Sequence, residues 1–183
     1  MGKGLGGGFA PMGAVLVHDK VIKGIQGGSG WFVHSHTYQA HGVGCAAALA
    51  VQKILRRDRL IERSATKGKW LQQALIATFG DRKYVGEIRG KGLFWGIEFV
   101  RDKASKEPFE PSLRFTWLMV NEALRRGLSV YPGAGTADGI KGDHIIIAPA
   151  YNMSDDEFDE MLRLLTETYN AVEKEVMGRF ATQ

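Results

Sequence analysis

Glycine crowds a single lysine at the start of this 183-residue chain, in the order Met1-Gly2-Lys3-Gly4-Leu5-Gly6-Gly7-Gly8. Glycine adopts backbone conformations that other residues avoid, and it lets a ligand approach the backbone without meeting a Cβ atom. A desolvated lysine amine can form a Schiff base with a carbonyl group. The segment therefore predicts a close-fitting site for an aldehyde at Lys3, and its alternative is a flexible glycine-rich tail.

Gly2, Gly4 and Gly7 also satisfy the G-x-G-x-x-G spacing of a dinucleotide-binding turn. That fingerprint has meaning only when it follows a strand and opens a helix. Too few residues precede it to build a strand, and Pro11 stands where the helix should be running. The spacing therefore does not predict a dinucleotide site.

Four ordered segments carry a family resemblance. They are residues 3–11 with Gly13-Ala14, then His36-Thr37-Tyr38-Gln39-Ala40-His41, then residues 88–98, then Ile147-Ala148-Pro149 ahead of an acidic terminal helix. Together they resemble class III pyridoxal-phosphate-dependent aminotransferases, the ω-amino-acid type, over nearly the whole chain. The first is similar to the family's lysine segment, and the second to the segment whose threonine binds the cofactor phosphate.

The resemblance implies that Lys3 is the catalytic Schiff-base lysine holding pyridoxal 5'-phosphate (PLP), and that Thr37 is a second cofactor-binding residue. In the family this threonine reaches the cofactor of the neighbouring subunit, which implies a homodimer with composite sites. The implied fold is α/β, part of a fold type I PLP-dependent transferase. Residues 1–58 would be the C-terminal part of the large PLP-binding domain, residues 59–82 a connecting helix, and residues 83–183 the small C-terminal α+β domain.

Physical chemistry supports Thr37 independently of the resemblance. Residues 42–56 are expected to form a helix, and the N-terminal end of a helix offers unpaired N–H groups and a positive dipole that favour phosphate. Thr37 adds a hydroxyl donor just before that helix. The alternative is that Thr37 is only a local turn or capping residue.

Two departures from the family pattern bear on function. Members that use 2-oxoglutarate-type partners commonly place a carboxylate-binding arginine just before a Pro-Pro pair, where this chain has Ile145-Ile146-Ile147. The resemblance is therefore to the pyruvate-coupled, ω-amino-acid or amine branch. The family also carries a long region before its lysine, which supplies much of the cofactor cage, so we expect a carboxy-terminal portion of an aminotransferase.

The expected reaction is PLP-dependent transamination, which moves an amino group from an amine or ω-amino acid to an oxo acid such as pyruvate. A non-catalytic fragment, or half of a split enzyme that needs a complementary N-terminal chain, is the alternative from another class. A related PLP enzyme, such as an aminomutase, racemase or decarboxylase, is the third.

Two arginines are candidates for holding a substrate carboxylate, because a guanidinium makes bidentate contacts with that planar group. Arg89 lies at an expected strand turn, where a structural role is its alternative, and Arg101 follows the next strand. Lys141, inside a glycine-bounded loop, is a weaker candidate.

Other site classes have little support. The net charge is +4, but the basic residues from Arg56 to Lys69 are spread around helices, so a nucleic-acid partner is not expected. His34, His36 and His41 have no cysteine or carboxylate close by in sequence to complete a tetrahedral site, so no metal is expected. Cys45, the only cysteine, is expected to be a small apolar packing residue.

With 44% hydrophobic residues the chain can bury a substantial core, yet it has no apolar stretch of membrane-spanning length. The amino terminus also lacks the order of a secretory signal. We therefore expect a cytoplasmic location and no membrane partner.

Hydrophobic periodicity predicts alternating helices and strands. Helices are expected at residues 42–56, 59–79 and 113–126 and after Ser154, strands at residues 13–17, 85–89, 93–100, 128–131 and 144–148, and a glycine-rich loop at residues 24–30.

Overall fold

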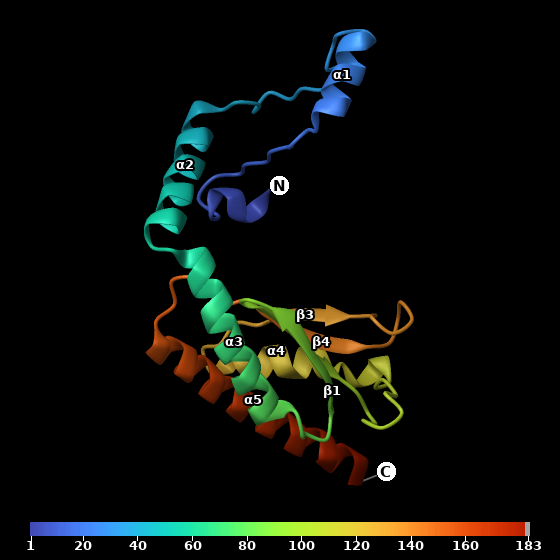
Figure 1. Cartoon of the computed structure of the whole chain (residues 1–183). Helices are drawn as coiled ribbons and strands as arrows, with labels where there is room; N and C mark the ends of the chain where they lie inside the picture. The colour runs from blue at the N-terminus through green and yellow to red at the C-terminus, as the bar shows by residue number, and fades with distance from the viewer. Residues whose placement is uncertain (182–183) are drawn as a thin grey trace. The chain divides into compact units, whose positions relative to one another are not determined.

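The structure is a computed structural model that describes residues 1–181 (Figure 1). Its elements, in chain order, are η1 (Lys3–Gly6), α1 (Asp19–Gly27), α2 (Gly42–Arg57), α3 (Leu60–Phe79), β1 (Val85–Lys91), β2 (Phe94–Phe99), η2 (Pro111–Leu113), α4 (Phe115–Arg125), β3 (Tyr131–Ala134), β4 (Asp143–Ile147) and α5 (Asp155–Ala181). The chain divides into two compact units, Met1–Leu60 and Ile61–Gln183.

The second unit is built on a four-stranded antiparallel sheet with strand order β1-β2-β4-β3. Side chains alternate along β4, where Ile145 and Ile147 are buried while His144 and Ile146 are half-buried. This alternation is the two-residue period of a sheet that packs one face against a core.

The core of the second unit lies between that sheet face and the apolar stripes of α3, α4 and α5. Its buried members include Trp95, Ile97, Phe99, Ile145 and Ile147 from the strands and Leu71, Leu75, Phe79, Phe115, Met119, Phe158, Leu165 and Tyr169 from the helices. Phe115 packs against both Phe109 and Phe99 with ring centroids 4.7 Å apart, and the Phe109 ring is stacked on it while the Phe99 ring is tilted. Apolar burial of this kind is the main favourable term in folding.

A close approach fixes α3 against the β1–β2 turn. A Cβ atom at Gly68 would overlap the backbone of Gly92, so only glycine lets the helix come this near. Gly92 itself has a φ of 57°, a left-handed conformation that glycine adopts without strain. The Trp95 indole Nε1 donates to the carbonyl of Gly92 over 2.7 Å, and this hydrogen bond stabilises the turn.

The start of α5 is capped and tied to α3. Ser154 and Glu157 form a reciprocal capping box, because the Ser154 N–H donates to Glu157 Oε2 over 2.6 Å and the Glu157 N–H donates to Ser154 Oγ over 3.3 Å. From α3, Lys67 Nζ lies 3.0 Å from the Asp155 carboxylate. These bonds confirm the expected helix start after Ser154.

The first unit, by contrast, has few buried residues. Its buried residues are Gly6, Gly44, Ala48 and Leu60. α1 has no buried residue at all, although its sequence has the pattern of an amphipathic helix. The first unit therefore has no apolar core of its own comparable with that of the second.

All four expected helices are confirmed, but three other sequence predictions are wrong. Residues 13–17 are extended without belonging to a strand, because a strand is defined by pairing and these residues have no neighbouring strand in the described chain. α1 covers the first part of the expected glycine loop. β3 begins at Tyr131, where the sequence predicted the strand to end.

Candidate functional site

Lys3 is the first residue of η1 and is exposed. Its φ is 48°, the left-handed region that residues with a Cβ adopt at a cost of about 1 kcal/mol or more. Such strain persists only where the surroundings impose it, and it clusters at functional sites. The Lys3 backbone is therefore held in a conformation that its own residue type does not favour.

The segment around Lys3 is closed by a pair of hydrogen bonds between its ends. The Met1 amino group donates to the Ala14 carbonyl over 2.7 Å, and the Ala14 N–H donates back to the Met1 carbonyl over 2.9 Å. The glycine-rich residues thus form a closed loop, which we call the Lys3 loop (residues 1–14). The alternative of a flexible tail does not describe this geometry.

The Lys3 loop packs on α2. Gln52 Nε2, on α2, donates to the carbonyl of Leu5 over 3.0 Å. A Cβ atom at Gly7 would lie 3.1 Å from the Val51 side chain, and one at Gly44 would lie 2.9 Å from the Met12 sulfur. Glycine at these points lets the loop lie directly on the helix, so the loop and α2 form one local structure.

Thr37 lies in the turn that leads into α2. The Gln39 N–H donates to the His36 carbonyl over 3.0 Å, and this bond closes a turn with Thr37 at its second position. Thr37 is exposed, and its hydroxyl makes no hydrogen bond to another residue in the described chain. Thr37 is therefore a turn residue, as the alternative interpretation expected, but its hydroxyl is available to a ligand.

His41, not Thr37, caps α2. Its Nδ1 accepts a hydrogen bond from the Gly44 N–H over 3.2 Å. The N–H groups of Gly42 and Val43, in the first turn, find no acceptor among the described residues, as helix starts commonly show. The positive end of the α2 dipole adds to these donors. Nothing in the sequence predicted the His41 cap, since histidine is not among the preferred capping residues.

These groups have the chemistry that a phosphorylated aldehyde requires. The Lys3 amine suits a carbonyl carbon. The Thr37 hydroxyl and the free N–H groups at the start of α2 suit a phosphate. All of them belong to the first unit, and the Lys3 loop is bonded to the helix whose first turn supplies the donors. The donor set therefore fits PLP.

Arg89 lies in the second unit, on β1, and its guanidinium is engaged. Its Nη1 lies 2.9 Å from Glu98 Oε2 and 2.8 Å from Glu87 Oε2. The hydrogen bond to Glu98, together with the charges of Glu98 and Glu87, raises the pKa of Arg89. A substrate carboxylate would have to compete with two protein carboxylates for this group.

The two weaker candidates of the second unit are paired as well. Arg101 Nη1 lies 3.3 Å from Glu107 Oε1, and Lys141 Nζ lies 2.7 Å from Glu110 Oε1. The Glu110 carboxylate raises the pKa of Lys141. These pairs are exposed surface contacts of the kind that contributes little to stability.

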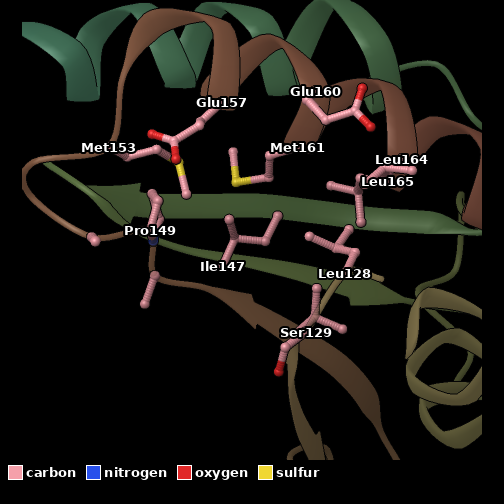
Figure 2. Close-up of a pocket in the computed structure, with 13 residues that line it drawn as sticks. Leu128, Ser129, Ile147, Pro149, Met153, Glu157, Glu160, Met161, Leu164 and Leu165 are labelled. Carbon is pink, nitrogen blue, oxygen red and sulfur yellow. The ribbon is translucent and has the colours of Figure 1, made fainter. Parts of the chain in front are cut away.

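A cavity of about 330 Å³ lies in the second unit between residues 128–130, the end of β4 and α5 (Figure 2). Ile147, Met161 and Leu165 form its apolar floor. Its two carboxylates already have partners, because Glu157 accepts from the Ser154 N–H and Glu160 from Arg163. The cavity therefore offers apolar contact and no available acid or base.

Within residues 1–181, no three histidine, cysteine, aspartate or glutamate side chains come close enough together to hold a metal ion. None of the helices in the described chain combines the length and the apolar character that crossing a membrane requires.

Comparison with known proteins identifies the family that this chain matches. The Aminotransferase class-III family profile matches residues 1–168. An aminotransferase of Gibberella zeae is 47% identical over 166 residues, which cover 90% of this chain and 32% of that protein. The uncharacterized aminotransferase YodT of Bacillus subtilis is 44% identical over 95% of this chain and 39% of its own length.

Solved structures agree with the sequence comparison. The PMP-bound form of an aminotransferase from Vibrio fluvialis superposes with a TM-score of 0.85 at 29% identity, over 96% of this chain and 37% of that one. The chain thus spans about a third of the length of the proteins it matches. The expected fold class, part of a fold type I PLP-dependent transferase, is confirmed, and the chain belongs to the class-III aminotransferases, a family that uses PLP.

Proposed function

We propose that this chain supplies the lysine and a phosphate-binding threonine of a PLP-dependent transaminase. The observation that carries the proposal is the Lys3 loop, which is closed on itself, strained at Lys3 and bonded to α2. Thr37 leads into the same helix, at the end where N–H donors are free. Residues 1–58 would then be the C-terminal part of the large domain, residues 59–82 a connecting helix and residues 83–183 the small domain.

Within this proposal each residue has a stated task. PLP, when bound, supplies the electron sink that makes the amine-bearing carbon acidic. Lys3 Nζ would hold the aldehyde carbon in the resting enzyme and, once free, carry the proton removed from the donor. Thr37 Oγ1 and the N–H groups of Gly42 and Val43 would donate to the phosphate and fix its position. The closed Lys3 loop would orient the amine.

The proposal extends to assembly and substrates. By analogy with the family, Thr37 would serve the cofactor of a neighbouring copy, so the active form would be a homodimer with composite sites. An amine or ω-amino acid would be the donor and an oxo acid such as pyruvate the acceptor. The choice of pyruvate is supported by β4, which carries Ile145, Ile146 and Ile147 where 2-oxoglutarate users commonly have an arginine. Arg89 remains a weaker substrate candidate.

The test is alanine formation from pyruvate with a primary arylalkylamine as donor, in the presence of PLP. Lys3→Ala should abolish the reaction, because no other residue of the closed loop carries an amine side chain. Lys20→Ala is the matched control, since Lys20 is an exposed lysine of the same unit, on α1. Equal activity of the two variants would reject Lys3 as the catalytic lysine. Racemisation or decarboxylation of the donor without pyruvate would favour a related PLP enzyme.

A second candidate function is half of a split enzyme. The observation that favours it is the exposed apolar surface of the first unit, where Val15, Leu16, Trp31 and Val33 are each more than three-quarters exposed. Surface of this kind marks an interaction site. In that case the chain would acquire activity only with a complementary polypeptide, and the transamination test would have to be repeated on the complex.

A further inference from the structure

The carbonyl of Leu5 differs from its neighbours in the glycine-rich turn. The carbonyls of Gly2, Gly4 and Gly6 each accept an N–H group of the Lys3 loop itself, over 3.0 to 3.1 Å. No backbone N–H in residues 1–181 donates to Leu5. The last carbonyls of a helix have no acceptor role within it, and they need a partner from outside. The Leu5 carbonyl is therefore left to a group outside the Lys3 loop.

That group is a side chain of α2. Gln52 Nε2 donates to the Leu5 carbonyl over 3.0 Å, although 47 positions separate the two residues, and Figure 1 shows the short N-terminal helix beside α2. In the described chain no other side chain of α2 hydrogen-bonds to residues 1–14. A hydrogen bond is directional, whereas apolar contact is not. Gln52 therefore fixes how η1 is oriented on α2.

The residue before Gln52 contacts the next position of the turn. Gly7 ends η1 with a φ of 59°, and a Cβ atom there would lie 3.1 Å from both methyl groups of Val51. Consecutive residues of α2 thus hold the end of η1 in two ways, Val51 by packing and Gln52 by a hydrogen bond. Packing alone would allow the turn to slide along the helix, and the hydrogen bond prevents this.

Lys3 begins the same short helix, two residues before Leu5. Its φ of 48° is a strained value that the surroundings must impose. Lys3 is exposed, and its Nζ has no hydrogen bond or ion pair within residues 1–181. Since the direction of a side chain follows its backbone, the conformation of η1 decides where the Lys3 amine points. Release of the Leu5 carbonyl would let η1 relax and would turn this amine.

We propose that Gln52 is a positioning residue, which holds η1 on α2 through the Leu5 carbonyl and thereby aims the Lys3 amine. The inference rests on the proposed function, in which Lys3 is the lysine that binds PLP. Gln52 acts through the backbone of the Lys3 loop and needs no contact with the cofactor. Loss of one hydrogen bond changes an equilibrium by a factor of about two to ten, which sets the expected size of the effect.

The experiment compares two substitutions of Gln52 in the full chain. Gln52→Met keeps the length and the helix preference of the side chain but removes the donor, whereas Gln52→Arg restores N–H donors. Amide hydrogen exchange at Leu5, Gly7 and Phe9, measured without PLP, reports the order of η1. It should be about two to ten times faster in Gln52→Met, and it should return to within about twofold of the wild-type rate in Gln52→Arg.

The second readout is the rate at which PLP and borohydride label Lys3, divided by the rate at Lys20 in the same sample. Lys20 is an exposed lysine of α1, so it corrects for differences in reagent. The ratio should fall by a factor of about two to ten in Gln52→Met and recover in Gln52→Arg. Gln73→Met is the matched control. Gln73 is an exposed glutamine of α3, in the second unit, so neither readout should change.

Each remaining outcome decides against the proposal or against the function on which it rests. Unchanged exchange in Gln52→Met, or equal acceleration in Gln73→Met, would overturn the proposal. Exchange that stays fast in Gln52→Arg would also overturn it, because a restored donor should restore the turn. Faster exchange with an unchanged labelling ratio would show that Gln52 does not aim the amine. The proposed function fails on a different result, namely a wild-type Lys3 labelled no faster than Lys20, whatever the exchange rates.

Discussion

The two units of this chain differ in where their apolar residues lie. Ile61–Gln183 packs a sheet face against three helices, and every member of the core cluster belongs to it. Met1–Leu60 contains the candidate cofactor residues but leaves Val15, Leu16 and Trp31 in contact with solvent. The candidate cofactor residues therefore lie in the first unit, whereas the apolar core lies in the second.

Family membership and self-sufficient folding are therefore separate properties of a chain. Burial of apolar area provides most of the free energy of folding, and a region without it must obtain that free energy elsewhere. The Lys3 loop is ordered by local bonds, namely the Met1–Ala14 pair and the Gln52 contact. Three comparisons between the units, and one pH dependence within the second unit, test this interpretation.

The largest effect is expected from removing a leucine. Leu165→Ala should lower the free energy of unfolding by about 2–5 kcal/mol, because Leu165 is fully buried and the change leaves a cavity. Leu16→Ala should change it by less than about 0.5 kcal/mol, because Leu16 is already exposed. Urea unfolding followed by circular dichroism measures both. Similar losses in the two variants would show that the first unit has a core after all.

A methyl group added at a glycine gives the next largest contrast. Gly68→Ala should lower the free energy of unfolding by about 1–3 kcal/mol, since its Cβ would overlap the rigid backbone of Gly92. Gly44→Ala should be within about 0.5 kcal/mol of neutral, because its Cβ would crowd only the flexible end of Met12, would lie at an ordinary contact distance of 3.6 Å from His41 Nδ1, and alanine favours the helix. Urea unfolding of both variants measures these changes. A loss of more than about 1 kcal/mol in Gly44→Ala would contradict the prediction and would mean that the Lys3 loop packs rigidly on α2.

Removal of a helix cap should also lower stability more in the second unit than in the first. Ser154→Ala should lower the free energy of unfolding by about 1 kcal/mol, because it removes half of the capping box of α5. His41→Ala should leave the main unfolding transition in place, since α2 lies outside the core that unfolds in it. A shift of that transition by His41→Ala equal to the Ser154→Ala shift would contradict the comparison.

The smallest effect is a pH dependence confined to the second unit. Burial, and then the nearby charge of Arg89, lowers the pKa of His144, whose Nδ1 is buried without a hydrogen-bond partner. Glu98 and Asp143 oppose this shift. Because the folded state binds the proton less well, stability is fully present above pH about 6.5 and is lost as the pH falls through the pKa of the folded state.

His144→Gln should flatten this dependence between about pH 5 and 7, because glutamine does not titrate. The melting temperature of wild type and variant, measured across that range, gives the comparison, and NMR titration of the imidazole gives the pKa directly. Parallel pH profiles of the two proteins would rule out His144 as the source.

The sequence predicted elements well where apolar residues recur along a helix. α2 was expected to end at Arg56 and ends at Arg57, and α3 was expected to begin at Arg59 and begins at Leu60. The helix α1 was missed because Gly24 and Gly27 lie in it, and glycine is a poor helix former that indicated a loop.

Strands were harder because their limits depend on pairing partners that the sequence does not reveal. β3 contains Pro132 and Gly133, residues that argue against a strand. The structure explains the glycine, since a Cβ atom at Gly133 would overlap the ring of His144 on the paired strand. Residues 13–17 have the pattern of a strand but lack a partner in the described chain.

The candidate site was reached from residue types and resemblance, and the roles of Lys3, Thr37 and Arg89 stay predictions. What the structure adds is local. The Lys3 loop is closed by bonds between Met1 and Ala14 and is bonded to Gln52 through Leu5. These residues are far apart in sequence, so no local sequence pattern predicts the bonds. Of the two carboxylates at Arg89, Glu87 lies two residues earlier on the same strand, whereas Glu98 is brought there by the cross-strand register, which the sequence does not reveal.

The most direct measurement of the central claim is where PLP becomes fixed on the chain. The protein is incubated with PLP, reduced with borohydride, digested and mapped by peptide mass. We predict that Lys3 is labelled ahead of the exposed lysines Lys20 and Lys53, because Lys3 lies in a closed loop whose strained backbone holds its amine in place. Labelling spread evenly over exposed lysines, with Lys3 no more modified than the others, would contradict the account.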